Sequence, residues 1–541
     1  MRGYNLTTSG AGAVSAGSTS LGGALTITVG ASAPLTLGAF ALGGSNLTTA
    51  GAGTLTAGAT TLGGNVTFSV GSDSTLVLGA LSDSGIRTIT KGGAGVMSLV
   101  ATAGTLASGT VFELSAGTLN LNASGSVLGT ATVLKVADGA TVNVVESNSI
   151  GGLANPGSVL NTGSVVLSAG KTLTVGGSDG LSSAFSGAIS GSGLLAKGGA
   201  GILTLSGTNI FTGATTVSAG ALSYAKVAAL STGSAVTVSS GAAIGLGVKA
   251  DDALYFSATQ VDSLFADTLS GVTLASASLV GIDTTAGNFT YGSDITGTTH
   301  GLAKLGDNTL TWNATGLAGS TSVFAGTLSL GAATALGSGT ATIFGGTLDL
   351  NGKAIANNVV VAGGTLSGGS IPLNQVTPQT GVISAILTGN YAFSKTTSGT
   401  LTLSGNNTYG GITTISNGVL SLGSDTALSA GAVTLSGGML DLNGKTIANS
   451  ISIYGGTLSG GTIALSQVGL VQDHSGSAVI SAILTGTSGL TKSTRGTLML
   501  SGANTFSGTV TVSDGLLGVT SDAALGALAN SITVAGNANS Y

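Results

Sequence analysis

The chain repeats long stretches of its own sequence, and this self-similarity constrains its fold more than any other feature. The stretch KGGAGILTLSGTNIFTGATTVSAGALS, which begins at Lys197, returns as KTTSGTLTLSGNNTYGGITTISNGVLSL from Lys395 and as KSTRGTLMLSGANTFSGTVTVSDGLLGV from Lys492. Internal repetition is typical of architectures in which one structural unit stacks on the next. We therefore expect the chain to build length rather than a single enclosed site.

A second repeated block shows where the array tolerates variation. Residues 345–376 recur 92 residues later, whereas the octapeptide VISAILTG at Val382 recurs at Val479, 97 residues later. About five residues are therefore inserted between the two matches, and insertions of this kind belong in loops. The sequence predicts a tandem array with variable loops.

Within each copy, apolar residues alternate with Thr or Ser, as in TLTLSG, TTVSAGALS and VTVSDGLLGV. A period of two, with Gly or Asn-Gly at the boundaries, indicates short half-buried strands joined by turns. Frequent Gly discourages helices, and the β-branched Thr and Val suit a pleated surface.

Several all-β architectures can be built from such strands. A propeller would need a blade motif such as Trp-Asp, but the chain has one Trp, and a membrane barrel would carry aromatic girdles. A parallel β-helix, or β-solenoid, explains the repeats better, because apolar residues form a continuous core and Thr, Ser and Asn face outward. At the ~4.8 Å strand spacing and roughly 20 to 25 residues per coil, we expect a rod on the order of 100 Å long.

Composition excludes several functions. Charged residues make up 6% of the 541 residues and the net charge is -5, so nucleic acid is not an expected partner. The absence of Cys excludes a disulfide framework and thiolate sites. We find no apolar run long enough for a membrane-spanning helix and no signal peptide at the start. No cofactor or metal motif is present either, including the nonapeptide calcium repeat.

Three positions recur in the repeats and are predicted to be structural. We interpret a Lys slot as solubilising residues at a coil edge; a polyanion-binding role is the alternative, although intervals of 91 to 107 residues would not form a dense patch. We expect the Asn slot to satisfy backbone groups at a corner, with an Asn ladder as one form of this. The aromatic slot is expected to fill the core or a corner. The residues are Lys91, Lys197, Lys304, Lys395 and Lys492; Asn209, Asn407 and Asn504; and Phe211, Tyr409 and Phe506.

An irregular acidic segment, residues 251–300, interrupts the repeats and is the place where we would look first for a ligand. The candidate ligand residues are Asp251, Asp252, Asp262 and Asp267. A glycan-processing β-helix enzyme would need such carboxylates together with Lys, Arg or His, and this segment offers little base. The alternative is a solvated loop. The two His, His300 and His474, share no local motif, and no Ser lies in a nucleophile elbow, so we predict no enzyme activity.

The phrase GLLAKGGAGILTLSGTNIFTGATTVSAGAL and its copies resemble the autotransporter-associated β-strand repeat of bacterial autotransporter passengers. The segment from Ile282 is similar to one often found before such a repeat. The match is good from Lys197, Lys395 and Lys492, weaker at Lys304 and weakest at Lys91. This resemblance implies a right-handed parallel β-helix displayed outside the cell, often in adhesion, aggregation or biofilm. The family's signal peptide and translocator barrel are not found in this chain, which is therefore expected to be a fragment.

We divide the chain into degenerate solenoid repeats (1–90), solenoid with autotransporter-type repeats (91–250), the acidic segment (251–300) and the most regular solenoid (301–541). The leading hypothesis is an extracellular structural and adhesive rod at the bacterial outer surface. Its partners would be a host or neighbouring cell surface, glycans, or further copies of itself. The alternative is a subunit that assembles into filaments through the open strand edges at the ends of the β-helix.

Overall fold

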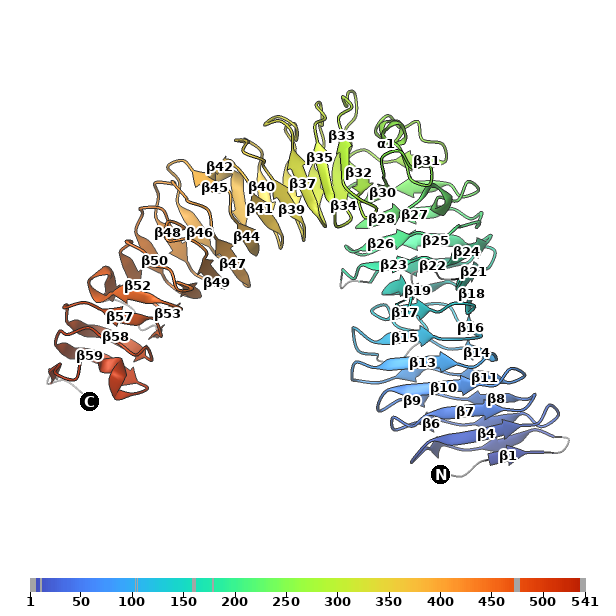
Figure 1. The fold of residues 1–541 in the computed structure, drawn as a ribbon. Coiled ribbons are helices and arrows are strands. Elements are labelled where there is room, and N and C mark those ends of the chain that lie inside the picture. Colours follow the sequence, from blue (N-terminus) through green and yellow to red (C-terminus); the bar gives the residue numbers. More distant parts are fainter. Residues whose placement is uncertain are drawn as a thin grey trace. The chain divides into compact units, whose positions relative to one another are not determined.

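The computed structural model describes residues 6–9, 12–102, 104, 106–157, 162–177, 180–470 and 477–535, which form stacked coils of short strands (Figure 1). Neighbouring strands run parallel, and successive coils are in register. Leu25 lies opposite Leu47, and Leu47 lies opposite Phe68, so these coils advance by 22 and 21 residues. The predicted all-β parallel β-solenoid is confirmed.

The period-two pattern explains how each strand divides its side chains. In β16 (Thr118–Leu121), the two Leu are buried while Thr118 and Asn120 are partly exposed. Leu119 lies opposite Val142 of β18 (Thr141–Val144), so apolar side chains form ladders along the interior. Full burial of one such side chain contributes roughly 1.5–3 kcal/mol. Stability therefore comes from many neighbour contacts rather than from one central core.

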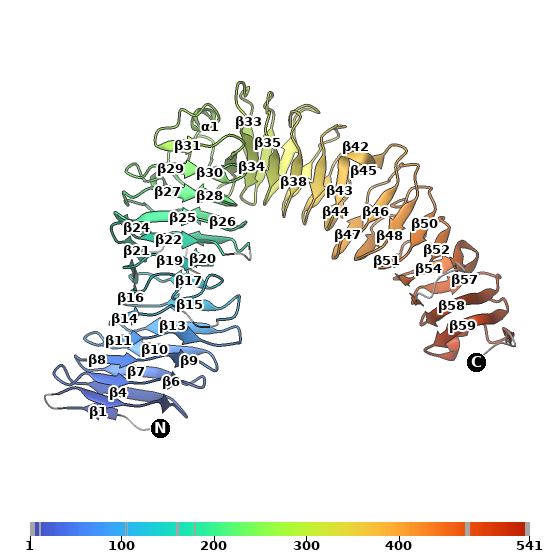
Figure 2. The ribbon, with the colours of Figure 1, turned by 180° about the vertical axis from the view of Figure 1, so that it is seen from behind.

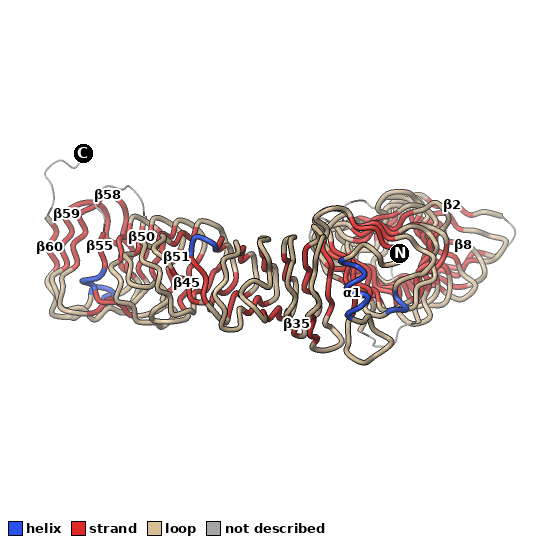
Figure 3. Tube along the Cα trace, turned by 90° about the horizontal axis from the view of Figure 1, so that it is seen from above, coloured by secondary structure: helices blue, strands red, loops and turns tan. Residues whose placement is uncertain are grey.

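The chain divides into two compact units, of which the first comprises Met1–Phe289 and Gly297–Leu305. Viewed along its stack, its strands superpose as walls around the interior (Figure 3). One wall contains β1 (Leu6–Thr8), β4 (Leu25–Val29), β7 (Leu47–Ala50), β10 (Val66–Val70), β13 (Thr88–Gly92), β15 (Val111–Leu114), β17 (Val133–Val136) and β20 (Gly152–Ala154). A second contains β2 (Val14–Ala16), β5 (Leu35–Leu37), β8 (Thr54–Ala57), β11 (Thr75–Leu78), β14 (Val96–Leu99), β16, β18, β21 (Ser164–Leu167) and β24 (Ala188–Gly191).

Three further walls complete the first unit. The shortest contains β3 (Thr19–Ser20), β6 (Phe40–Ala41), β9 (Thr60–Thr61) and β12 (Leu81–Ser82). Another contains β19 (Asn148–Ile150), β22 (Thr172–Val175), β25 (Leu194–Lys197), β27 (Thr215–Val217), β29 (Val236–Val238) and β31 (Val272–Leu274). The last contains β23 (Ser183–Phe185), β26 (Ile202–Leu205), β28 (Ala221–Tyr224), β30 (Ala243–Gly247), β32 (Leu279–Asp283) and β34 (Gly301–Leu305).

In the second unit, Thr290–Thr296 and Gly306–Tyr541, several coils are shorter than we predicted. Thr309, Thr327, Thr347 and Thr365 lie in one register, so successive coils advance by 18, 20 and 18 residues. Strands of three or four residues joined by Gly-containing turns form these short coils. Figure 2 shows these coils from behind.

The longest wall of the second unit contains β33 (Phe289–Tyr291), β35 (Thr309–Trp312), β37 (Thr327–Leu330), β39 (Thr347–Asp349), β41 (Thr365–Ser367), β44 (Gly381–Ile383), β47 (Thr400–Leu403), β49 (Val419–Leu422), β51 (Met439–Asp441), β53 (Gly456–Ser459), β56 (Ala478–Ile480), β58 (Leu490–Leu500), β59 (Val510–Val519) and β60 (Ile532–Val534). Two others contain β36 (Thr321–Val323), β38 (Ala341–Ile343), β40 (Val359–Val361) and β43 (Val376–Pro378), and β46 (Phe393–Lys395), β48 (Thr413–Ile415), β50 (Val433–Leu435), β52 (Ile451–Ile453) and β55 (Val468–Leu470). Two further sheets have two strands each: β42 (Ser370–Pro372) with β45 (Ile386–Thr388), and β54 (Thr462–Ala464) with β57 (Ile483–Thr485).

Helical structure is confined to short segments. Among the described residues, the α-helix is α1 (Ala258–Phe265), and the 3-10 turns are η1 (Val227–Ala229), η2 (Leu373–Gln375), η3 (Leu465–Gln467) and η4 (Asp522–Leu525). A capping box between Ser257 and Gln260 starts α1, and Val261, Leu264 and Phe265 are buried. The excursion that carries α1 lengthens the step from Val236 to Val272 to 36 residues.

Candidate functional site

The five recurring lysines are buried, which corrects our interpretation of them as solubilising residues at a coil edge. Their exposed fractions are 0–1% for Lys91, Lys197, Lys304, Lys395 and Lys492. A buried ammonium group is costly unless its hydrogen-bonding capacity is satisfied. Each slot therefore needs acceptors, and the neighbouring turns supply them.

Lys91 shows how the slot works. Its Nζ donates to the carbonyl oxygens of Gly93 and Gly95, both at 2.6 Å, and to that of Ala116 on the next coil at 2.9 Å. A Cβ atom on Gly117 (φ +72°) would lie 2.5 Å from this Nζ, which explains why Gly occupies the turn. Burial lowers the pKa of Lys91 to about 8.

The other lysines also bind backbone carbonyls of nearby turns. Lys197 donates to Gly198, to Gly199 (2.9 Å) and to Ala219 (3.3 Å), and burial lowers its pKa to about 8 as well. The remaining acceptors are the carbonyls of Leu305 for Lys304 (2.7 Å), Thr397 for Lys395 and Asp514 for Lys492 (3.3 Å). These hydrogen bonds hold the ammonium groups in the interior. The groups are therefore not accessible to an anionic ligand on the surface.

The Asn slot satisfies backbone groups, as predicted. Asn407 Oδ1 accepts from the amide of Leu387 at 2.9 Å, and its Nδ2 donates to the carbonyl of Ala427 at 2.6 Å. One side chain thus bridges the coil 20 residues before it and the coil 20 residues after it. Asn209 and Asn504 make equivalent bonds, to Ile189 and Ala229 and to Leu484 and Ala524. The bonds run to backbone rather than to other Asn side chains, so no Asn ladder forms through these three residues.

The aromatic slot fills the core, also as predicted. The exposed fractions of Phe211, Tyr409 and Phe506 are 0–1%. The ring of Tyr409 stacks on Phe393 at 6.2 Å, and its hydroxyl lies 2.7 Å from Thr413 Oγ1. Burial raises the pKa of Tyr409 to about 12. The repeat positions are therefore internal supports of the coils.

The acidic segment surrounds α1, and its carboxylates have separate partners. Asp252 pairs with Lys249 at 3.0 Å, whereas Asp267 lies after α1 and pairs with His300. Asp262 belongs to α1, and Asp251 adopts a left-handed conformation (φ 55°) in the loop before it. Among the described residues, no three His, Asp or Glu side chains are grouped so that they could hold a metal ion.

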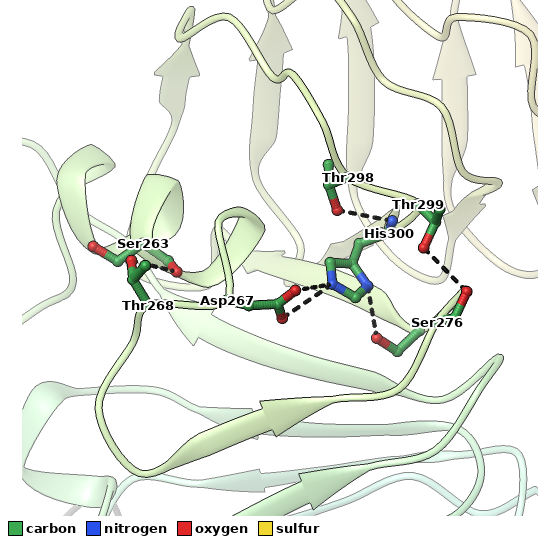
Figure 4. A network of polar contacts seen from close by, with 8 residues as sticks. Ser263, Asp267, Thr268, Ser276, Thr298, Thr299 and His300 are labelled. Carbon is green, nitrogen blue, oxygen red and sulfur yellow. Dashed lines mark hydrogen bonds and ion pairs between the residues drawn. The ribbon is translucent and has the colours of Figure 1, made fainter.

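His300 links the α1 excursion to the coils (Figure 4). Its Nε2 lies 3.0 and 3.1 Å from the two carboxylate oxygens of Asp267, and its Nδ1 lies 3.1 Å from Ser278 Oγ. Our sequence reasoning treated His300 as an isolated residue. The missing signal was the register, because Leu279 lies opposite Gly301 and Ser278 therefore neighbours His300 on the next coil.

This Ser–His–Asp chain has the residue types of a hydrolase but not their accessibility. Ser278 is 0% exposed and His300 is 3% exposed, so the hydroxyl cannot reach a substrate from solvent. The hydrogen bonds of His300 fix the loop after α1 against the solenoid. His474, the other His of the chain, lies outside the described residues.

Among the described residues, no helix is long and apolar enough to cross a membrane. The fold and the repeated slots define a class: a parallel β-solenoid of tandem repeats whose recurring Lys, Asn and aromatic side chains are buried. The family described as Passenger-associated-transport-repeat matches residues 195–223, 393–422 and 490–519, where the sequence resemblance was good.

The chain is also similar to an adhesin. It is 43% identical over 118 residues, or 21% of its length, to the Adhesin BmaC autotransporter of Brucella suis biovar 1 (strain 1330). The match spans only 3% of that adhesin. No solved structure matches the chain. The recognition of an autotransporter passenger repeat is confirmed, and both likenesses point to a structural or adhesive protein rather than to a known enzyme.

Proposed function

We propose that this chain is part of an autotransporter passenger and acts at the bacterial outer surface, where it mediates attachment to other surfaces or aggregation between cells. The three passenger repeats carry this proposal. The contacts support it, because the repeated Lys, Asn and aromatic side chains serve the interior and leave a hydroxyl-rich, weakly charged exterior for contact with partners.

The proposal is tested by displaying the chain on a non-adherent bacterium through an autotransporter translocator. Attachment to host cells and settling of the culture are then measured. We expect increased attachment or faster settling than with an unrelated β-solenoid displayed at the same density. Equal values for the two displayed proteins would contradict an adhesive role.

A second candidate is self-assembly through coil ends, because the coils stack by parallel strand pairing and the same pairing would join one chain to another at an uncovered edge. Electron microscopy over a hundredfold range of concentration should then show continuous filaments at high concentration; separate particles throughout would exclude this candidate.

A further inference from the structure

A hollow lies on the second unit beside the first residues of β42 and β45; Figure 1 labels both strands. The hollow spans several coils and has a volume of about 510 Å³, within the range of small-molecule sites. Gly352, Gly368 and Gly369 line one part of it. A Cβ atom on Gly368 (φ +77°) would lie 1.8 Å from Asp349 Oδ1, and one on Gly369 would lie 2.2 Å from the Lys353 carbonyl oxygen. The fold therefore requires glycine at both positions, and the hollow results.

The lining of the hollow carries no charge. Its remaining side chains are Ser370, Ser384, Ser404, Ile386 and Asn406. A charged ligand would find no counter-charge in this lining.

The charged side chains near the hollow already form hydrogen bonds within the protein. Asp349 accepts from the Asn351 amide at 2.9 Å and from Ser329 Oγ at 3.1 Å. Lys353 Nζ donates to the Asn351 carbonyl at 2.9 Å. The hollow therefore suits a neutral ligand.

Asn406 offers the hollow a hydrogen-bond donor. Ser424 Oγ and Thr426 Oγ1 on the following coil bind its Oδ1 at 3.1 and 2.8 Å. Within the described part of the chain, its Nδ2 makes no hydrogen bond. Asn406 also lines the hollow, so its amide lies within reach of a ligand bound there.

Ile386 adds an apolar surface, because it is 38% exposed beside the hydroxyls of Ser370 and Ser404. An apolar face bordered by hydroxyl and amide groups matches a sugar ring, which has a C–H face and a rim of hydroxyls. A folded protein would need a far larger surface, roughly 800 Å² per partner. We propose that this hollow binds an oligosaccharide without charged groups through the Asn406 amide, the serine hydroxyls and Ile386.

The chain contains its own comparison for this site. Ile386 recurs as Ile483, which is 36% exposed, and Ser370 recurs as Thr462. Asn406, however, is replaced by Ala503 in the second copy. The second copy thus lacks the amide donor, and substitutions there control for effects on the fold.

This inference rests on the proposed adhesive function, and the test separates the two. The purified chain is applied to an array of neutral, sialylated and sulfated oligosaccharides, and the affinity of any neutral binder is measured by calorimetry. We expect Asn406→Ala to weaken binding about fivefold, as loss of one hydrogen bond predicts. Ser370→Trp should abolish binding by filling the hollow, whereas Thr462→Trp should change affinity by less than about twofold.

Several results would overturn the proposal. These are binding of charged oligosaccharides alone, no binding to any oligosaccharide, or equal losses in Ser370→Trp and Thr462→Trp. The displayed chain is assayed in parallel for cell attachment. Attachment that persists in Ser370→Trp together with lost glycan binding supports the hollow as one site among others. Attachment without any glycan binding overturns the hollow and leaves the adhesive function standing.

Discussion

The repeated turns and the α1 excursion use their polar side chains in opposite ways. In the repeats, Lys91 and Asn407 are buried and bind backbone groups of neighbouring coils. In the excursion, polar side chains pair with one another, as in Lys249–Asp252 and His300–Asp267, and Asp267 is 55% exposed. Side chains in the repeats therefore maintain the coil geometry, whereas those in the excursion hold one loop in place.

This difference predicts where substitutions will be costly. A buried backbone group that loses its partner costs about 1–3 kcal/mol, whereas an exposed ion pair contributes about 0–1 kcal/mol. The four predictions below test this contrast, from the largest expected effect to the smallest.

Asn407→Ala should have the largest effect, a loss of about 3 kcal/mol in local stability, because it leaves the Leu387 amide and the Ala427 carbonyl without partners. Hydrogen exchange of the flanking coils would measure this loss. Asn406→Ala, one residue away and exposed, is the control and should cost less than about 1 kcal/mol. Similar losses in both variants would show that the bridging bonds are not what stabilises these coils.

Lys197→Met should lower local stability by about 2 kcal/mol, because the carbonyls of Gly199 and Ala219 lose a donor while the apolar stem remains. The readout is hydrogen exchange in residues 195–223. Lys171→Met removes a half-exposed partner of Glu146 and serves as the control, with a cost below about 1 kcal/mol. If the control costs more than Lys197→Met, the buried slot is not the stronger contact.

The buried lysines also predict a dependence of stability on pH. Burial lowers the pKa of Lys91 and Lys197 from 10.5 to about 8. Between these values the unfolded chain binds more protons than the folded chain, so stability should rise from pH 8 to pH 10, by on the order of 1 kcal/mol per lysine. Above pH 10 it should fall, because burial raises the pKa of Tyr409 to about 12 and unfolded tyrosines ionise first.

Thermal unfolding between pH 7 and pH 11 measures this profile. The Lys91→Met, Lys197→Met double variant should lose most of the rise and keep the fall. A wild-type profile that decreases steadily from pH 8 would contradict the lowered lysine pKa values.

Asp267→Ala should have the smallest effect, about 0.5 kcal/mol, because the carboxylate is half exposed where it meets His300. Hydrogen exchange should increase in α1 and in the loop after it, while the coils on either side stay protected. Faster exchange throughout the first unit would mean that the excursion supports the solenoid as well.

Much of this architecture could be predicted from the sequence, because alternation and repetition report directly on strands and stacking. The alternation in TLTL and its copies predicted which side chains are buried and which face outward. The position of Asn407, shortly before an aromatic residue, indicated a corner of the coil. Both depend on residue types whose behaviour in strands and turns is largely local.

The remaining features depend on register, which local patterns do not contain. Lys is seldom buried, and the carbonyl oxygens that accept hydrogen bonds from Lys91 Nζ come from two successive turns. Ser278 and His300 become neighbours only when the coil length is known. The hollow was also missed, since Gly368 and Gly369 look like any other glycine pair in a chain with 95 Gly.

The Asn bridges bear on how such a gene can lengthen. Each bridge requires its partners about 20 residues away on both sides, so an inserted or deleted segment preserves every bridge only when it contains whole coils. The duplicated block meets this condition, because β39 is followed in its sheet by β41, β44, β47, β49 and then β51, which is the copy of β39 92 residues later. Recombination between such copies would change the length of the solenoid by whole coils without creating a new fold.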